Sequence, residues 1–166
     1  MNQRLKIYLD TSVPNFLFAD DSPEKMEVTL DLFSNFIKTS IYRSCISPVV
    51  IAEIDETKDN EKRLKLLNIF KEYPIEVLDY SETEELEIQE LADKYIENKI
   101  IPEKKVADAL HIAICVIKGI DYLVSWNYKH LANIHKENRI KLLNWELGYR
   151  HELRIITPLE LMDYGI

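Results

Sequence analysis

The sequence has few of the residues that interrupt regular structure, with only three glycines and six prolines among its 166 residues. It has no low-complexity tract, no linker-like stretch and no internal repeat. Hydrophobic residues make up 46% and charged residues 30%, an ordinary globular balance at a length that suits one sizeable core. We therefore expect a single domain over residues 1–166.

Long apolar runs are also missing. The stretch at residues 112–117 is typical of the longest ones, and it is far shorter than the roughly 20 residues that cross a bilayer. Residues 1–6 lack the apolar segment and cleavage site of a signal peptide, so we expect a cytoplasmic protein without a membrane partner. The two cysteines, Cys45 and Cys115, stand in apolar surroundings and form no metal-ligand pair, which predicts buried free thiols.

Positive charge is in short supply as well. Twenty-nine acidic residues outnumber 21 lysines and arginines, for a formal net charge of −8. This balance argues against a protein that grips nucleic acid by a broad basic surface. It remains compatible with an enzyme whose acids bind divalent metal ions, because the ions then supply the positive charge that faces phosphate.

The segments that are present alternate between strand-like and helix-like patterns. Short strands are expected at residues 6–10, 42–46, 74–78, 121–125 and 154–156. Helices are expected from Pro23 to Ile37, from the Ser47-Pro48 start, around residues 64–70, from the capping box at Ser81 to Ile96, at residues 106–118 and 130–136, and after Thr157. This alternation predicts an α/β sandwich around a mainly parallel sheet.

Three acids stand in apolar company: Asp10, Glu53 and Asp108. Burying a carboxylate without a partner is costly, so such acids are usually paired or bound to a cation. Lys104 and Lys105 could pair with Asp108, but that pairing would leave the other two acids unexplained. A shared divalent cation would satisfy all three, and oxygen ligands favour Mg²⁺ or Mn²⁺ over zinc.

Several polar residues are expected close to the first of these acids. Asp10 and the pair Trp126 and Asn127 each follow a predicted strand, so they should meet at the same edge of the sheet. Thr11 and Ser12 add two hydroxyls directly after Asp10. These hydroxyls could orient the carboxylate or contact a phosphate oxygen of a substrate, and they could also cap the turn after the strand.

Two further side chains have more ordinary interpretations. His111 lies one helical turn after Asp108, and a hydrogen-bonded histidine is a better interpretation than a metal ligand or a general base. Trp126 is interpreted as a packing residue rather than as a platform for base stacking.

In five stretches, taken in order, the chain resembles the PIN-domain family. The stretches are Tyr8–Ser12, Ser47–Ile54, Ala107–Ala113, Tyr122–Leu131 and Ile155–Leu161. Each is weak alone, but together they run nearly end to end at family-like spacing. The resemblance implies a Rossmann-like α/β/α sandwich with a parallel sheet of about five strands. It also implies divalent-metal-dependent cleavage of RNA phosphodiesters.

Within the family, the nearest likeness is to VapC-type toxins of type II toxin–antitoxin pairs. The likeness implies an RNA substrate, a homodimer and a small antitoxin protein as partners. We predict an endoribonuclease with Asp10, Glu53, Asp108 and Asn127 as its catalytic residues. Asp10 and Asp108 would ligate Mg²⁺ or Mn²⁺ directly, and Glu53 would ligate it through water or orient a ligand. Asn127 would help to place the second ion or the attacking water. Thr11 and Ser12 would position the substrate.

The family often carries an aspartate where this chain has Asn127, and an amide adds no negative charge for a second ion. One alternative is therefore a catalytically weak PIN-like module that binds RNA or a partner protein without cutting. Another is a phosphatase with Asp10 as its nucleophile, in the manner of haloacid dehalogenases. Those enzymes carry a second aspartate at the position that Ser12 occupies here, so this alternative ranks well below the others.

Overall fold

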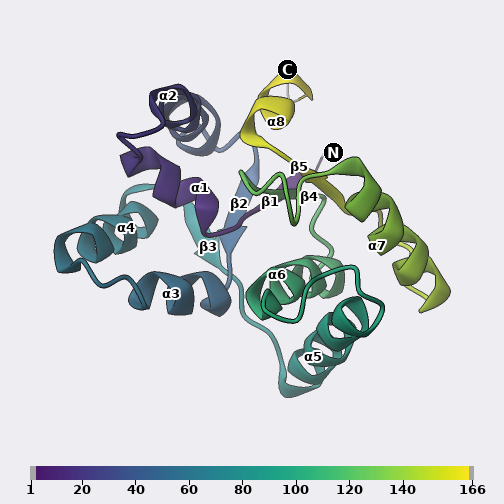
Figure 1. Ribbon diagram of the computed structural model, residues 1–166. Coiled ribbons are helices and arrows are strands. Elements are labelled where there is room, and N and C mark those ends of the chain that lie inside the picture. The colour runs from purple at the N-terminus through teal and green to yellow at the C-terminus, as the bar shows by residue number, and fades with distance from the viewer. Residues whose placement is uncertain (1–2, 165–166) are drawn as a thin grey trace.

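A five-stranded parallel sheet lies at the centre of the computed structural model, which describes residues 3–164 (Figure 1). The strands are β1 (Lys6–Leu9), β2 (Arg43–Ile46), β3 (Ile75–Val77), β4 (Tyr122–Val124) and β5 (Arg154–Ile156). Their order is β3-β2-β1-β4-β5, and each neighbouring pair in this sheet is parallel. All five strands lie within one or two residues of the predicted bounds, and the predicted α/β class is confirmed.

The register of the two central strands positions the polar residues that follow them. Leu9 lies opposite Val124 in the pairing of β1 with β4. The next residue of β1's chain, Asp10, donates its backbone N–H to the Val124 carbonyl at 3.2 Å. The residues that leave β1 and β4 therefore start from the same level of the sheet, at its carboxyl edge.

Helices cover both faces of the sheet, with α5 and α6 together on one side and α1 and α2 on the other (Figure 1). The helical elements are α1 (Ser12–Asn15), the 3₁₀ turn η1 (Phe16–Phe18), α2 (Pro23–Asp31), the π-helical segment η2 (Leu32–Ile37), α3 (Pro48–Asp55), α4 (Asn60–Glu72), α5 (Glu82–Glu97), α6 (Val106–Ile117), α7 (Ile134–Glu146) and α8 (Pro158–Tyr164). The arrangement is the α/β/α sandwich that the sequence predicts.

Three predicted helix starts are confirmed by their capping hydrogen bonds. The Ser47 hydroxyl accepts a backbone N–H of the first turn of α3 at 3.2 Å. Ser81 and Glu84 form a reciprocal capping box at the start of α5. Thr157 and Glu160 do the same for α8, because each side chain accepts the other residue's backbone N–H. Such caps satisfy N–H groups that have no partner within the helix.

The short helix predicted over residues 130–136 is wrong in its bounds. Residues 128–132 form turns, and α7 starts only at Ile134 and runs on to Glu146. The start is set by Asn133, whose side chain accepts the N–H of Lys136 at 2.9 Å. The helical turns of α1 and η1, directly after Asp10, were not predicted either.

The core is centred on β1 and α6. Ile7 and Leu9 of β1 are fully buried, and α6 is buried on most of its surface from Ala109 to Val116. Cys45 and Cys115 are buried free thiols, as predicted. In the part of the chain that the structure describes, the helices are all too short or too polar to span a membrane. The expectation of one domain over residues 1–166 stays a prediction.

Candidate active site at the carboxyl edge of the sheet

Asp10 leaves β1 into a buried polar pocket and is only 4% exposed. Its Oδ1 accepts the Ser12 backbone N–H at 3.1 Å and also the Ser12 hydroxyl, and its Oδ2 accepts the Ser125 hydroxyl at 2.5 Å. Burial raises the pKa of Asp10 above its ordinary value, although His111 and the two serines oppose that shift. The carboxylate is therefore held by neutral donors.

The same two serines connect Asp10 to the segment that follows β4. The Ser12 hydroxyl oxygen accepts the Trp126 backbone N–H at 3.0 Å, and the Ser125 oxygen accepts that of Asn127 at 2.9 Å. The structure thus brings Asp10, Trp126 and Asn127 together at one edge of the sheet, as expected. The Ser12 hydroxyl orients Asp10, which is one of the roles considered for it.

Glu53 of α3 has a different environment, although it lies at the same edge. Its Oε1 accepts the Thr11 hydroxyl at 2.7 Å and lies 2.6 Å from Nε2 of His111. Burial acts to raise the pKa of Glu53, but the hydrogen bonds from His111 and Thr11 outweigh it and hold that pKa below its ordinary value. Thr11, predicted to position the substrate, here orients Glu53.

His111 is the centre of a buried hydrogen-bond chain. Because the Glu53 carboxylate only accepts, Nε2 of His111 donates to it, and Nδ1 of His111 lies 2.6 Å from the Tyr8 hydroxyl oxygen. The Tyr8 oxygen in turn lies 2.6 Å from the Ser47 hydroxyl. The interpretation of His111 as a hydrogen-bonded histidine is confirmed. The hydrogen bonds from Ser47 through Tyr8 and His111 fix the orientation of Glu53.

Asp108 lies in the first turn of α6 and is partly buried. Burial raises the pKa of Asp108, and the charge of Glu53 adds to that effect, while His111 and Lys105 oppose it. Asn127 donates to Asp108 through Nδ2 at 3.4 Å. Within residues 3–164, no ion pair joins Asp108 to Lys104 or Lys105, so the ion-pair alternative lacks support.

The amide of Asn127 is fixed at both ends. Its nitrogen faces Asp108, and its oxygen accepts the backbone N–H of His130 at 3.0 Å. Burial lowers the pKa of His130, and the positive charges of Lys136, Lys105 and Lys129 act in the same direction. A small group of cations therefore borders the Asp108 side of the edge in a chain that is acidic as a whole.

The predicted ligand set does not close into a complete metal cage. Among the described residues, no group of three or more His, Cys, Asp or Glu side chains is placed to hold a metal ion. The acids are still near enough to act on one another. The charge of Asp108 raises the pKa of Asp10, and the charge of Glu53 raises the pKa of Asp108. The three acids share one edge without converging on one point.

Sequence reasoning did not identify three residues of this edge: Tyr8, Ser47 and Ser125. Ser125 had a signal, because it follows β4 at the position where Asp10 follows β1. Tyr8 and Ser47 had none, because Tyr8 meets His111, 103 residues further along the chain, only through packing of α6, and Ser47 joins them through its bond to Tyr8.

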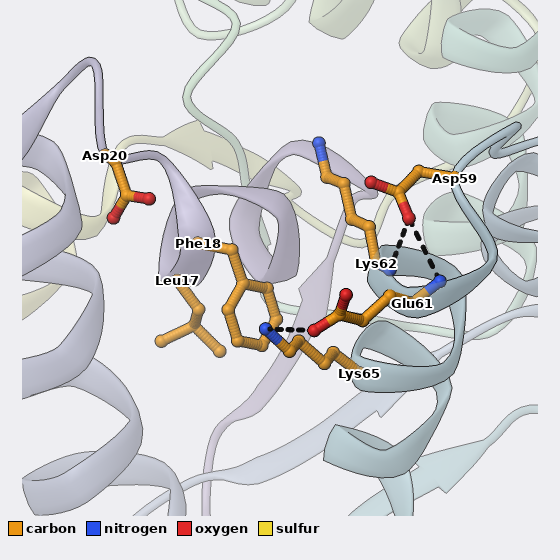
Figure 2. Close-up of a pocket in the computed structure, with 7 residues that line it drawn as sticks. All are labelled: Leu17, Phe18, Asp20, Asp59, Glu61, Lys62 and Lys65. Carbon is orange, nitrogen blue, oxygen red and sulfur yellow. Dashed lines mark hydrogen bonds and ion pairs between the residues drawn. The ribbon is translucent and has the colours of Figure 1, made fainter.

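A separate pocket of about 340 Å³ lies between η1 and the start of α4 (Figure 2). Two of its charged side chains, Glu61 and Lys65, pair with each other at 3.5 Å, and Asp59 caps α4 by accepting the backbone N–H groups of Glu61 and Lys62. None of the predicted site residues lines it. We therefore place the candidate active site at the strand ends and not in this pocket.

The fold and this edge define an α/β/α protein with acidic residues at the ends of parallel strands. The model of the PIN domain family matches residues 7–136, and the chain belongs to that family. The family resemblance seen in the sequence is thus confirmed.

Two solved structures share the fold. VapBC2 from Rickettsia felis, bound to a DNA fragment from their promoter, is 18% identical with a TM-score of 0.56, covering 92% of this chain and 98% of that one. VapBC-1 from nontypeable Haemophilus influenzae is 16% identical with a TM-score of 0.56, covering 93% and 99%. No curated protein matches the chain.

Proposed function

We propose that this protein is a divalent-metal-dependent endoribonuclease, the toxin of a type II toxin–antitoxin pair. The observation that carries the proposal is the pair Asp10 and Asp108, two partly or fully buried carboxylates at the carboxyl edge of a parallel sheet without a cationic ion-pair partner in residues 3–164. Membership of the PIN domain family and the fold shared with VapBC structures support it.

The donor chemistry of this edge fits Mg²⁺ or Mn²⁺. Asp10 and Asp108 offer carboxylate oxygens, which these hard cations prefer. Burial makes the ionised form of both side chains unfavourable, so a cation would relieve the cost that raises their pKa values. When bound, a divalent cation lowers the pKa of water and offsets negative charge on the phosphate.

Each residue of the edge then has a role. Asp10, fixed by Ser12, and Asp108 would hold the cation. Glu53 has one oxygen engaged by Thr11 and His111, and its other oxygen, which has no hydrogen bond within the described residues, orients the attacking water. Asn127 keeps Asp108 in place through its amide nitrogen.

The reaction is an in-line displacement at phosphorus. The water oxygen bonds to phosphorus as the bond to the 3′-oxygen breaks. One proton of the water passes to solvent, and the leaving 3′-oxygen takes up a proton from solvent to become the hydroxyl. The products carry a 5′-phosphate and a 3′-hydroxyl. The 2′-hydroxyl of RNA takes no part in this chemistry, so the preference for RNA over DNA comes from binding and not from the chemical step.

The proposed partners follow from the structural neighbours. Both neighbours are structures of VapBC proteins. For this chain we propose a small antitoxin protein that suppresses activity, and a homodimer in its absence. Light scattering of the purified chain and of the chain co-expressed with the product of an adjacent gene would test both.

The test of the activity uses a mixed cellular RNA pool with Mg²⁺ or Mn²⁺, with and without EDTA. The wild type should cut, EDTA should stop it, and Asp10→Ala/Asp108→Ala should be inactive while still folded. Asp55→Ala/Asp93→Ala is the matched control, because it removes two exposed aspartates with the same change in net charge. Equal cutting by the wild type and the Asp10/Asp108 variant would contradict the proposal.

Two observations favour a second candidate, a PIN-like module that binds RNA or a partner protein without cutting it. The described residues form no closed ligand cluster, and Asn127 turns its nitrogen towards Asp108. Tight Mn²⁺ binding by a folded wild type that cuts no RNA would support this candidate. Asn127→Asp would then test whether the missing charge is the cause.

A further inference from the structure

An aromatic cluster with a lysine at its centre borders the candidate active site. The ammonium of Lys25 on α2 lies 5.2 Å from the ring centroid of Phe16, 5.7 Å from that of Trp126 and 5.2 Å from that of Tyr128. The rings also contact one another, with centroids 5.8 Å apart for Phe16 and Trp126 and 6.2 Å apart for Trp126 and Tyr128. Two consecutive helical elements, η1 and α2, thus meet the distant segment that follows β4 at one cation.

The members of this cluster differ sharply in exposure. Trp126 is 4% exposed, and its indole N–H donates to the buried hydroxyl of Thr29 at 3.0 Å, so it is the packing residue that the sequence predicts. Tyr128 is 45% exposed. The buried indole therefore anchors the cluster to α2, and Tyr128 is the ring that it presents to solvent.

Tyr128 lies directly beside the candidate active site. It follows Asn127, which donates to Asp108 and whose backbone is tied to Asp10 through Ser125. The next residue, Lys129, belongs to the cations around His130 described above. An exposed aromatic ring and positive charges thus adjoin the two carboxylates, in a chain with a net charge of −8.

We propose that the exposed ring of Tyr128, with Lys25 beside it, binds an unpaired nucleobase of the RNA strand next to the phosphate that is cut. The inference rests on the proposed function and adds a substrate-binding residue to it. A tyrosine ring offers a flat π surface to any base, and a neighbouring cation attracts the adjoining phosphate. The substrate class is therefore single-stranded RNA, because a base within a duplex cannot stack on a side chain.

The rest of the surface offers a control. Trp145 at the end of α7 is 61% exposed, and the guanidinium of Arg150 lies 3.9 Å from its ring centroid. This pair has the same elements, an exposed ring and a cation, but Figure 1 places the end of α7 away from α1 and α2. If exposed aromatic rings bound RNA wherever they occurred, Trp145 would contribute as much as Tyr128.

The experiment measures binding without cleavage. Fluorescence anisotropy of a short, labelled single-stranded RNA is followed in EDTA with the wild type, Tyr128→Ala, Tyr128→Phe and Trp145→Ala. Loss of one base stack should weaken binding by about tenfold for Tyr128→Ala. Tyr128→Phe, which keeps the ring, and Trp145→Ala should bind as the wild type does. Lys25→Met should weaken binding and lower its dependence on salt.

The decisive comparison uses the same RNA strand with abasic sugars. The wild type should bind it about as weakly as Tyr128→Ala binds the normal strand, and the Tyr128→Ala substitution should cost nothing further. Equal binding of the normal strand by the wild type and Tyr128→Ala, or no measurable binding by the wild type, would overturn the inference. Because EDTA removes catalysis from the assay, a failure of the nuclease proposal would appear separately, in the cleavage test above.

Discussion

The Asp10 side and the Glu53 side of the candidate site each hold a carboxylate at the sheet edge, but they shift its pKa in opposite directions. Both carboxylates lie at one edge of the sheet and both accept hydrogen bonds from hydroxyl groups of the same short segment. Yet the pKa of Asp10 is raised and that of Glu53 is lowered. Asp10 is more deeply buried and is held by serines alone, whereas Glu53 accepts from the imidazole of His111.

The difference shows that counting hydrogen bonds does not predict the charge state of a buried acid. Hydroxyl donors stabilise a carboxylate only in part, and deep burial outweighs them at Asp10. An imidazole that donates from a fixed chain outweighs burial at Glu53. The Asp10 side is therefore suited to receive a cation, and the Glu53 side is already satisfied by the protein.

The largest expected effect is on the cleavage rate, which should fall more for a substitution at Asp10 than for one at Glu53. Asp10→Asn should lower the cleavage rate by on the order of a thousandfold, because it removes charge where the cation is held, a loss of the size seen for single electrostatic contributors to catalysis. Glu53→Gln should cost on the order of ten- to a hundredfold, as for residues that orient others at a metal site. Single-turnover cleavage of one RNA would measure both. Asp55→Asn, at an exposed position of α3, is the control, and equal losses at Asp10 and Glu53 would end the distinction.

The second prediction concerns the hydrogen bonds from Tyr8 through His111 to Glu53. Tyr8→Phe removes one hydroxyl and leaves the buried ring. Nδ1 of His111 then loses its hydrogen-bond partner, but the fold is kept. We expect Mn²⁺ affinity to fall by about tenfold, because groups that orient metal-site residues have effects of that size. Isothermal titration calorimetry would measure it.

Cys115→Ala provides the comparison for Tyr8→Phe. It changes a buried side chain of α6 one turn after His111 and lies outside this chain of hydrogen bonds. Its expected effect is on stability alone. A loss of Mn²⁺ affinity with Cys115→Ala as large as with Tyr8→Phe would show that general packing, and not the orientation of Glu53, is responsible.

A smaller effect concerns stability at Asp108. The pKa of Asp108 in the folded protein lies above its ordinary value of 3.8. The folded state therefore loses stability as the pH rises from 3.8 to the raised pKa of the folded protein. Asp108→Asn removes this cost and should raise the midpoint of thermal unfolding in EDTA at neutral pH by about 2–4 °C, the shift that about 1 kcal/mol produces at this size. Calorimetry should show the gain shrinking as the pH falls towards 3.8, and a gain that is independent of pH would contradict this reasoning.

The smallest effect has the opposite sign and completes the comparison. The pKa of Glu53 is below its ordinary value of 4.5, so its ionised form stabilises the fold above that pH and the contribution is lost as the pH falls through the lowered pKa. Glu53→Gln should therefore destabilise the protein at neutral pH and cease to do so in acid. The change should be smaller than at Asp108, because the Glu53 side chain is 34% exposed and solvent screens it. Urea unfolding at several pH values would measure it, and stabilisation by Glu53→Gln would refute the assignment.

Local pattern was enough to predict the five strands, because each is a short segment with at least two apolar residues, the last of which ends the strand. The caps at Ser47, Ser81 and Thr157 were also readable, since a cap depends on residues within one turn. The start of α7 was misplaced, because two asparagines, Asn127 and Asn133, hold the preceding turns and the helix start through side-chain hydrogen bonds that periodicity does not reveal.

The sequence by itself determined that Asp10 would meet Trp126 and Asn127 at the sheet edge, because parallel strands deliver the residues that follow them to one side. Only the tertiary structure decided what each acid would face there. Packing of α6 against β1 places His111 between Tyr8 and Glu53, and the pairing of β1 with β4 places Ser125 against Asp10. Since burial and partners set the pKa of a carboxylate, the opposite electrostatics of Asp10 and Glu53 depend on contacts that join distant parts of the chain.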